Sequence, residues 1–144
     1  MLNLIVFCSG EGSSVMALDS IQNETEMPFR IRKIILNNKL NDTSILKNYL
    51  ALPNSPRYDV VRFDSENNTR DEYEYILYNA VKGELEETDY ILFLGWNFVV
   101  SQSFIEKLST RILNLHPALP GSYIGTSKVC IESALSDHKK HGLT

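Results

Sequence analysis

The chain has 144 residues, 43% of them apolar, and this length and composition fit a single soluble domain over residues 1–144 with a sizeable core. A net charge of −4 argues against sequence-independent nucleic-acid binding, and no stretch is apolar enough to suggest a membrane span. The amino end lacks a basic leader and a cleavage site, so we expect a cytoplasmic protein. The two cysteines lack Cys-x-x-Cys spacing, which fits reduced thiols and argues against a disulfide framework or a zinc site.

Apolar runs alternate with helical patterns along the chain. The expected strands are Leu2–Cys8, Phe29–Leu36, Tyr58–Phe63 and Tyr90–Leu94, the last an unbroken run typical of a central parallel strand. The expected helices are Ser13–Gln22, a segment with Tyr73, Ile76, Leu77, Ala80 and Val81 on one face, and a short helix after a capping box at Ser103–Glu106. Polar loops are expected at Asn38–Asn54 and Asp64–Thr69. This order predicts an α/β fold with a doubly wound, mainly parallel sheet.

A loop with two glycines follows the first expected strand and opens the first expected helix. Gly10 and Gly12 permit tight turns, and the amides of Gly12, Ser13 and Ser14 would point at an anion held at the positive end of the helix. The loop lacks the third glycine of the dinucleotide fingerprint and the Gly-Lys-Ser/Thr of a P-loop, so neither a nicotinamide cofactor nor ATP is favoured. Without a second motif, an ordinary strand-to-helix turn remains an equal alternative.

The second motif is Asn114-Leu115-His116-Pro117 at the end of an apolar run. Side chains two residues apart on a strand point to the same face, and Pro117 followed by Pro120-Gly121 ends the strand where the imidazole is presented. A histidine with a pKa near neutrality can give a proton to a reaction intermediate, and an asparagine amide can donate a hydrogen bond to the same oxygen. A bare Asn-x-His also occurs as a simple hydrogen-bonded strand end.

The segment Ile112–Gly121 resembles the signature of the folate-dependent formyltransferases, most closely the fungal type of phosphoribosylglycinamide formyltransferase. Leu4–Val15 is similar to the first strand and phosphate loop of that family. The resemblance implies a Rossmann-like formyltransferase fold. It also implies an enzyme of purine biosynthesis that transfers the formyl group of 10-formyltetrahydrofolate, its co-substrate, to the amine of phosphoribosylglycinamide by direct attack through a tetrahedral intermediate.

The resemblance assigns roles to individual residues. Gly12, Ser13 and Ser14 would hold the substrate phosphate, with Ser14 in place of the usual asparagine. His116 and Asn114 would be catalytic. The residues expected to bind the folate are Arg70, Asn97, Phe98, Val99, Val100 and Asn114. Asn97-Phe98 replaces the Met-Arg pair of bacterial relatives, so that arginine's charge contact is absent here. From the residues alone, Trp96, Phe98 and Val99 could equally be core, and Arg70 reads more readily as a surface residue at a helix start.

The aspartate that the family uses to raise the pKa of the catalytic histidine has no match before Thr144. We therefore expect an amino-terminal piece of the fold, without its last strands or its complete catalytic set, and with an exposed sheet edge that favours self-association. The expected partners are the two small substrates, with neither nucleic acid nor membrane. No metal is expected, because His138 and His141 read as a solvated helix end. A formyltetrahydrofolate hydrolase and a noncatalytic nucleotide- or folate-binding module remain alternatives.

Overall fold

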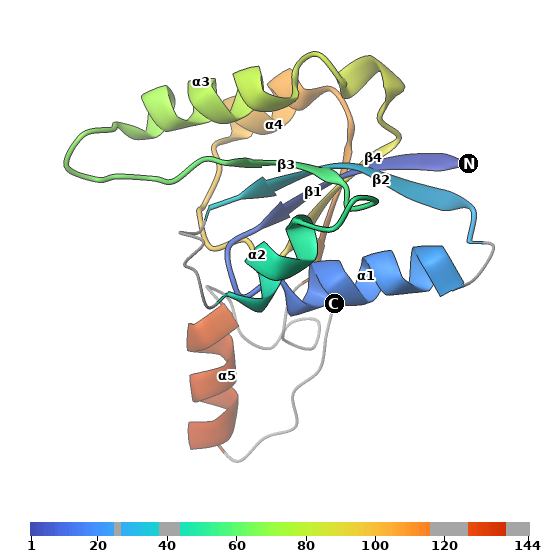
Figure 1. Cartoon of the computed structure of the whole chain (residues 1–144). Coiled ribbons are helices and arrows are strands. Elements are labelled where there is room, and N and C mark those ends of the chain that lie inside the picture. The colour runs from blue at the N-terminus through green and yellow to red at the C-terminus, as the bar shows by residue number, and fades with distance from the viewer. Residues whose placement is uncertain (25–26, 38–43, 116–126, 138–144) are drawn as a thin grey trace. The chain divides into compact units, whose positions relative to one another are not determined.

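The computed structural model describes residues 1–24, 27–37, 44–115 and 127–137, which include a five-stranded sheet (Figure 1). The strands are β1 Leu2–Cys8, β2 Phe29–Leu36, β3 Arg57–Val60, β4 Tyr90–Leu94 and β5 Arg111–Leu115. Their order across the sheet is β3-β2-β1-β4-β5, and β1 pairs in parallel with both β2 and β4, as β2 does with β3. The predicted doubly wound α/β fold is confirmed.

The helices are α1 Ser13–Glu24, α2 Ile45–Leu50, α3 Arg70–Val81, the single-turn η1 Leu85–Glu87, α4 Gln102–Leu108 and α5 Ser127–Ser136. The chain divides into two compact units, Met1–Leu113 and Asn114–Thr144, so that β5 crosses the boundary between them. A single domain over residues 1–144 stays a prediction. Among the described helices, none has both the length and the apolar character needed to cross a bilayer.

Both faces of β1 are buried, which explains its continuous apolar sequence. Ile5 and Phe7 pack with residues of α3 and α4 on one face, and Val6 and Cys8 pack with residues of α1 and α2 on the other. Figure 1 shows the two helical pairs on opposite sides of the sheet. Strands enclosed in this way lose the apolar–polar alternation of a half-exposed sheet.

Five local predictions differ from the structure. α1 continues two residues past the predicted Gln22, to Glu24. β3 ends at Val60, before the predicted Phe63, because the Phe63 amide donates to the Asn37 side chain at 2.9 Å and no longer to a strand. Helix α2 lies inside the predicted loop Asn38–Asn54 and begins where the Ser44 hydroxyl accepts from the Lys47 amide.

The capping box predicted at Ser103–Glu106 is wrong, since Ser101 is the N-cap of α4 and accepts from the Phe104 amide at 3.2 Å. In α3, Tyr73, Leu77 and Val81 are buried as expected, but Ile76 is 43% exposed.

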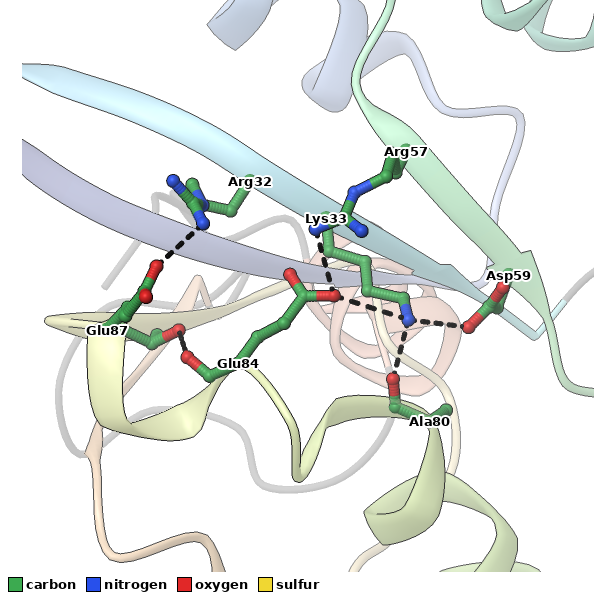
Figure 2. A network of polar contacts seen from close by, with 8 residues as sticks. Arg32, Lys33, Arg57, Asp59, Ala80, Glu84 and Glu87 are labelled. Atoms are coloured by element: carbon green, nitrogen blue, oxygen red, sulfur yellow. Dashed lines mark hydrogen bonds and ion pairs between the residues drawn. The ribbon is translucent and has the colours of Figure 1, made fainter.

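A network of charges lies between β2, β3 and the segment that follows α3 (Figure 2). A register shift between Leu4 and Ile5 sets Lys33 opposite Ile5. The Lys33 ammonium donates to the Ala80 carbonyl at 2.6 Å and lies 2.8 Å from an Asp59 oxygen and 3.6 Å from a Glu84 oxygen. Because the Lys33 and Glu84 side chains are only 14% and 15% exposed, their charges depend on each other for compensation.

Replacing Lys33 with methionine should therefore lower the free energy of unfolding by about 2 kcal/mol, because it leaves the Ala80 carbonyl without this donor and removes the less exposed of the two cations beside Glu84, which keeps its ion pair with Arg57. The matched control is Arg57→Met. Arg57 lies 3.2 Å from the same Glu84 oxygen, but its side chain is 69% exposed, so we expect a loss below about 1 kcal/mol. Urea unfolding followed by circular dichroism measures both. Equal losses for the two variants would contradict the role given to Lys33.

Candidate functional site

The loop after β1 forms the start of α1. Gly12 is buried and has a φ of 77°, a left-handed conformation that side chains disfavour. A Cβ atom placed there would lie 2.6 Å from the Leu46 side chain, so the loop passes close over α2. Ser13 and Ser14 are exposed in the first turn of α1, which contains no acidic residue. The predicted phosphate-binding residues thus include an exposed, positively polarised helix start.

The same loop closes over the Cys8 thiol. Burial raises the pKa of this thiol, while hydrogen bonds from the backbone amides of Gly10 and Gly12 oppose the rise. The thiol is thus held neutral, which suits an inert packing role and not a nucleophile. Because the Gly12 amide is directed at the sulfur, Ser13 and Ser14 are the better placed donors for an external anion.

The loop after β4 is tied to the loop after β1 and to the end of β2. Gly95 turns the chain with a φ of 65°, and the Asn97 amide donates to the Ser9 hydroxyl at 3.0 Å. The Asn37 side chain donates to the Asn97 side chain at 3.2 Å and accepts from the Phe63 amide at 2.9 Å. Segments that follow the carboxyl ends of β1, β2, β3 and β4 are therefore linked at one edge of the sheet, the edge where ligands bind in open parallel sheets.

Phe98 and Arg70, both predicted to bind the folate, lie in contact. The Phe98 ring lies 4.6 Å from the Tyr73 ring and 5.0 Å from the Phe63 ring between centroids, and the Arg70 guanidinium lies 5.8 Å from the Phe98 centroid. Thr69 caps α3 in a capping box with Glu72, which fixes the helix start that carries Arg70. Arg70 remains exposed, so its cation is oriented by the ring and open to solvent.

Half-buried and exposed residues alternate along the segment 97–100. Part of the segment therefore belongs to the core, and part faces solvent. Phe98 and Val100 are half-buried and pack against the core formed with α3 and α4, whereas Asn97 is exposed and Val99 is 67% exposed. The exposed backbone and side chains at 97 and 99 are the part of this segment that could meet a flat ligand.

Trp96, the only tryptophan of the chain, lies directly before this segment. Its ring packs edge-on against Phe7 at 5.2 Å and beside Phe93 at 6.1 Å between centroids. Its indole N–H is buried, and among the described residues it has no hydrogen-bond partner. The indole is therefore a single fluorescent reporter placed beside the candidate folate loop.

The Asn-x-His motif is described only in part. Asn114 is exposed on β5 and is the first residue of the second compact unit, so the structure does not place it relative to the loops of the first unit. His116 lies outside the described residues, as do His138 and His141. β5 is described as far as Leu115, so the predicted end of the strand at His116 stays a prediction.

Three residues that sequence reasoning missed support this edge of the sheet. Ser9 and Asn37 bond to Asn97, and Glu74 bonds to Ser101 just beyond Val100. Ser9 and Asn37 directly follow the buried strands β1 and β2, a position that could have identified them. Glu74 had no such signal, because a carboxylate in a helix normally faces solvent.

A pocket of about 680 Å³ lies at the opposite edge of the sheet. It is lined by residues that begin strands, among them Leu2, Tyr90 and Arg111. Strand starts are not where open parallel sheets bind their ligands, so we base the site on the tied loops and not on this hollow.

The comparisons with known proteins all point to one family. A family model described as formyl transferase matches residues 2–144. The chain is 28% identical to a phosphoribosylglycinamide formyltransferase of Dictyostelium discoideum over 148 aligned positions, which cover 96% of the chain and 69% of that protein. The enzyme of the same name from Saccharomyces cerevisiae is also 28% identical, over 88% of the chain and 64% of its own length.

Solved structures share the fold. A phosphoribosylglycinamide formyltransferase from Bacillus halodurans superposes with a TM-score of 0.76 at 21% identity, over 99% of the chain and 69% of that structure. Glycinamide ribonucleotide transformylase 1 from Geobacillus kaustophilus superposes with a TM-score of 0.79 at 21% identity, over 100% of the chain and 72% of that structure. The chain thus spans roughly two thirds of the length of these relatives, from 64% to 72%.

Proposed function

The chain belongs to the formyl transferase family, and we propose that it contributes to transfer of the formyl group from 10-formyltetrahydrofolate to the amine of phosphoribosylglycinamide, a step of purine biosynthesis. The observation that carries this proposal is the joining of the loops after β1 and β4 at one sheet edge, through Asn97 and Ser9, in a chain that the family model matches almost throughout. Two ligands that react with each other need two such neighbouring surfaces.

In this proposal the phosphate of the substrate binds at the exposed first turn of α1, at Ser13 and Ser14 beside Gly12. The pterin of the folate lies against Asn97, Phe98, Val99 and Val100, where backbone groups read its polar edge and the valines contact its faces. Arg70, held over the Phe98 ring, supplies a cation for the acidic tail of the folate.

The chemistry needs a proton donor and a hydrogen-bond donor beside the reacting carbon. The substrate amine attacks the formyl carbon, a C–N bond forms, and the carbonyl oxygen becomes an oxyanion. The oxyanion then re-forms the carbonyl as the bond between that carbon and the folate nitrogen breaks; the folate nitrogen takes up a proton and the attacking nitrogen gives one up, so no net proton is consumed. We assign proton donation to His116 and stabilisation of the oxyanion to Asn114, which also contacts the folate; no metal takes part.

Finer expectations belong to the same proposal. The enzyme would act in the cytoplasm on small molecules, without a nucleic-acid or membrane partner. Self-association would use an edge of the sheet, whose outer strands in the described residues are β3 and β5.

The first experiment follows the fluorescence of Trp96 during titration with 10-formyltetrahydrofolate, and in parallel the transfer of the formyl group to phosphoribosylglycinamide. We expect saturable quenching, because Trp96 directly precedes the proposed pterin surface in the chain and packs against the same core cluster as Phe98 and Val100. Absence of folate binding would overturn the proposal. Binding with release of formate, independent of phosphoribosylglycinamide, would instead favour a hydrolase, and binding of both ligands without turnover would favour a noncatalytic module.

A further inference from the structure

We propose that Glu74 is a positioning residue, which holds the folate-contacting segment Asn97–Val100 in place through Ser101; this rests on the proposed function. Glu74 lies on α3, and its side chain is directed at the start of α4. It does not touch a ligand in this proposal, and it acts on the loop only through its hydrogen bonds to Ser101.

Glu74 satisfies both polar groups of Ser101. One carboxylate oxygen accepts from the Ser101 amide at 2.6 Å, and the other accepts from the Ser101 hydroxyl at 2.6 Å. Glu74 is only 6% exposed and Ser101 is half-buried, so both hydrogen bonds are partly shielded from water. Charge-assisted bonds of this length are roughly twice as strong as neutral ones, which makes the pair a stiff connection between α3 and α4.

Ser101 is held from the other side by helix α4. Its hydroxyl oxygen accepts from the Phe104 amide at 3.2 Å, and Phe104 is buried in the core. The residue is therefore fixed by a helix on each side, and Val100 is attached directly to it. A shift of Ser101 would displace the last residue of the proposed pterin surface.

The other end of the segment has its own anchor. The Asn97 amide and side chain bond to Ser9 and Asn37, respectively. Only Phe98, Val99 and Val100 lie between the two anchors, and the Phe98 ring is enclosed by Tyr73 and Phe63. A segment fixed at both ends presents its backbone groups in one arrangement. Folate binding then does not include the entropic cost of ordering them.

The experiment compares Glu74→Leu with Glu74→Gln. Leucine accepts from neither group of Ser101, whereas glutamine keeps an oxygen for the amide and can donate to the hydroxyl. We expect Glu74→Leu to weaken folate binding, followed by Trp96 fluorescence, by about 10-fold, and Glu74→Gln to restore it to within about 3-fold of the unchanged protein. Binding of phosphoribosylglycinamide should stay within about 2-fold in both variants, because its proposed phosphate site is on α1.

The matched control is Asp19→Leu. Asp19 is a buried carboxylate, 4% exposed, that bonds to the Tyr49 hydroxyl on the opposite face of the sheet. Its replacement should lower stability comparably and leave folate binding unchanged. Equal weakening by Asp19→Leu, or unaltered folate binding in Glu74→Leu, would overturn the positioning role. Failure of the unchanged protein to bind folate would instead overturn the proposed function.

Discussion

Replacing Gly12 with alanine should lower the free energy of unfolding by about 3 kcal/mol. Among the described glycines, we expect this to be the most destabilising substitution by alanine. Two costs combine at this position. The φ of 77° costs an L-residue roughly 1–2 kcal/mol, and the added Cβ would lie 2.6 Å from a Leu46 methyl carbon, an overlap that costs roughly 1–3 kcal/mol. Leu46 is fully buried, so it cannot turn aside into solvent.

Alanine variants of two other glycines separate the cost of the positive φ from the cost of the steric overlap. Gly95 has a φ of 65° but open space around its Cβ position, so Gly95→Ala should cost about 1 kcal/mol from the backbone alone. At Gly10 the φ is not positive and no heavy atom of the described residues lies within 4 Å of an added Cβ, so Gly10→Ala should stay within about 0.5 kcal/mol of zero. Denaturant unfolding of the three variants would test the assignment, which fails if Gly12→Ala is no more damaging than Gly95→Ala.

A second-site variant tests the overlap directly. Leu46→Ala removes the methyl groups that the new Cβ would meet. In the double variant with Gly12→Ala, the loss should be smaller than the sum of the two single losses by about 1–2 kcal/mol, because the clash is absent from the second step. Simple additivity would show that the loop moves away from α2 and that the close approach is not built into the fold.

The first and last residues of the central strands could be predicted from the sequence, but those of the edge strand β3 could not. β1, β2 and β4 have the predicted limits, since β1 and β4 are largely apolar, as strands buried on both faces are, and β2 alternates apolar with basic residues between clear breaks. β3 is paired on one side only, and its end was predicted three residues too late. The apolar Val61 and Phe63 continue the strand pattern, but the Asn37 side chain takes the Phe63 amide out of the sheet.

The candidate site divides in the same way. Its loops could be located, because phosphate loops and ligand edges follow strands in a fixed order along the chain. The places of Ser9 and Asn37 after buried strands mark them as candidates, but the partners of the supporting residues could not be predicted, because Asn37 meets Asn97 across 60 positions of sequence and Glu74 meets Ser101 across 27. Such contacts have no period in the sequence. The capping prediction at Ser103 failed for a related reason, since Glu74 selects Ser101 as the residue that begins α4.

The variants with the largest expected effect on the reaction are His116→Ala and Asn114→Ala. Loss of a positioned proton donor should lower kcat about 10²–10⁴-fold, and loss of a single oxyanion donor should lower it roughly 10²–10³-fold. If both groups act on the same intermediate, the double variant should lose much less than the product of the two factors, because either loss alone already removes part of their shared effect.

The measurement is steady-state formyl transfer in this chain, or in a longer natural protein that contains it, with folate binding followed separately through Trp96. Neither variant should change binding of phosphoribosylglycinamide by more than about 3-fold, since its phosphate is assigned to the start of α1. Asn114→Ala should weaken folate binding to some degree, because the same amide is proposed to contact the folate, but by much less than it lowers kcat. If weaker binding of the ligands fully accounted for the fall in activity, the Asn-x-His motif would act in ligand recognition and not in the chemical step.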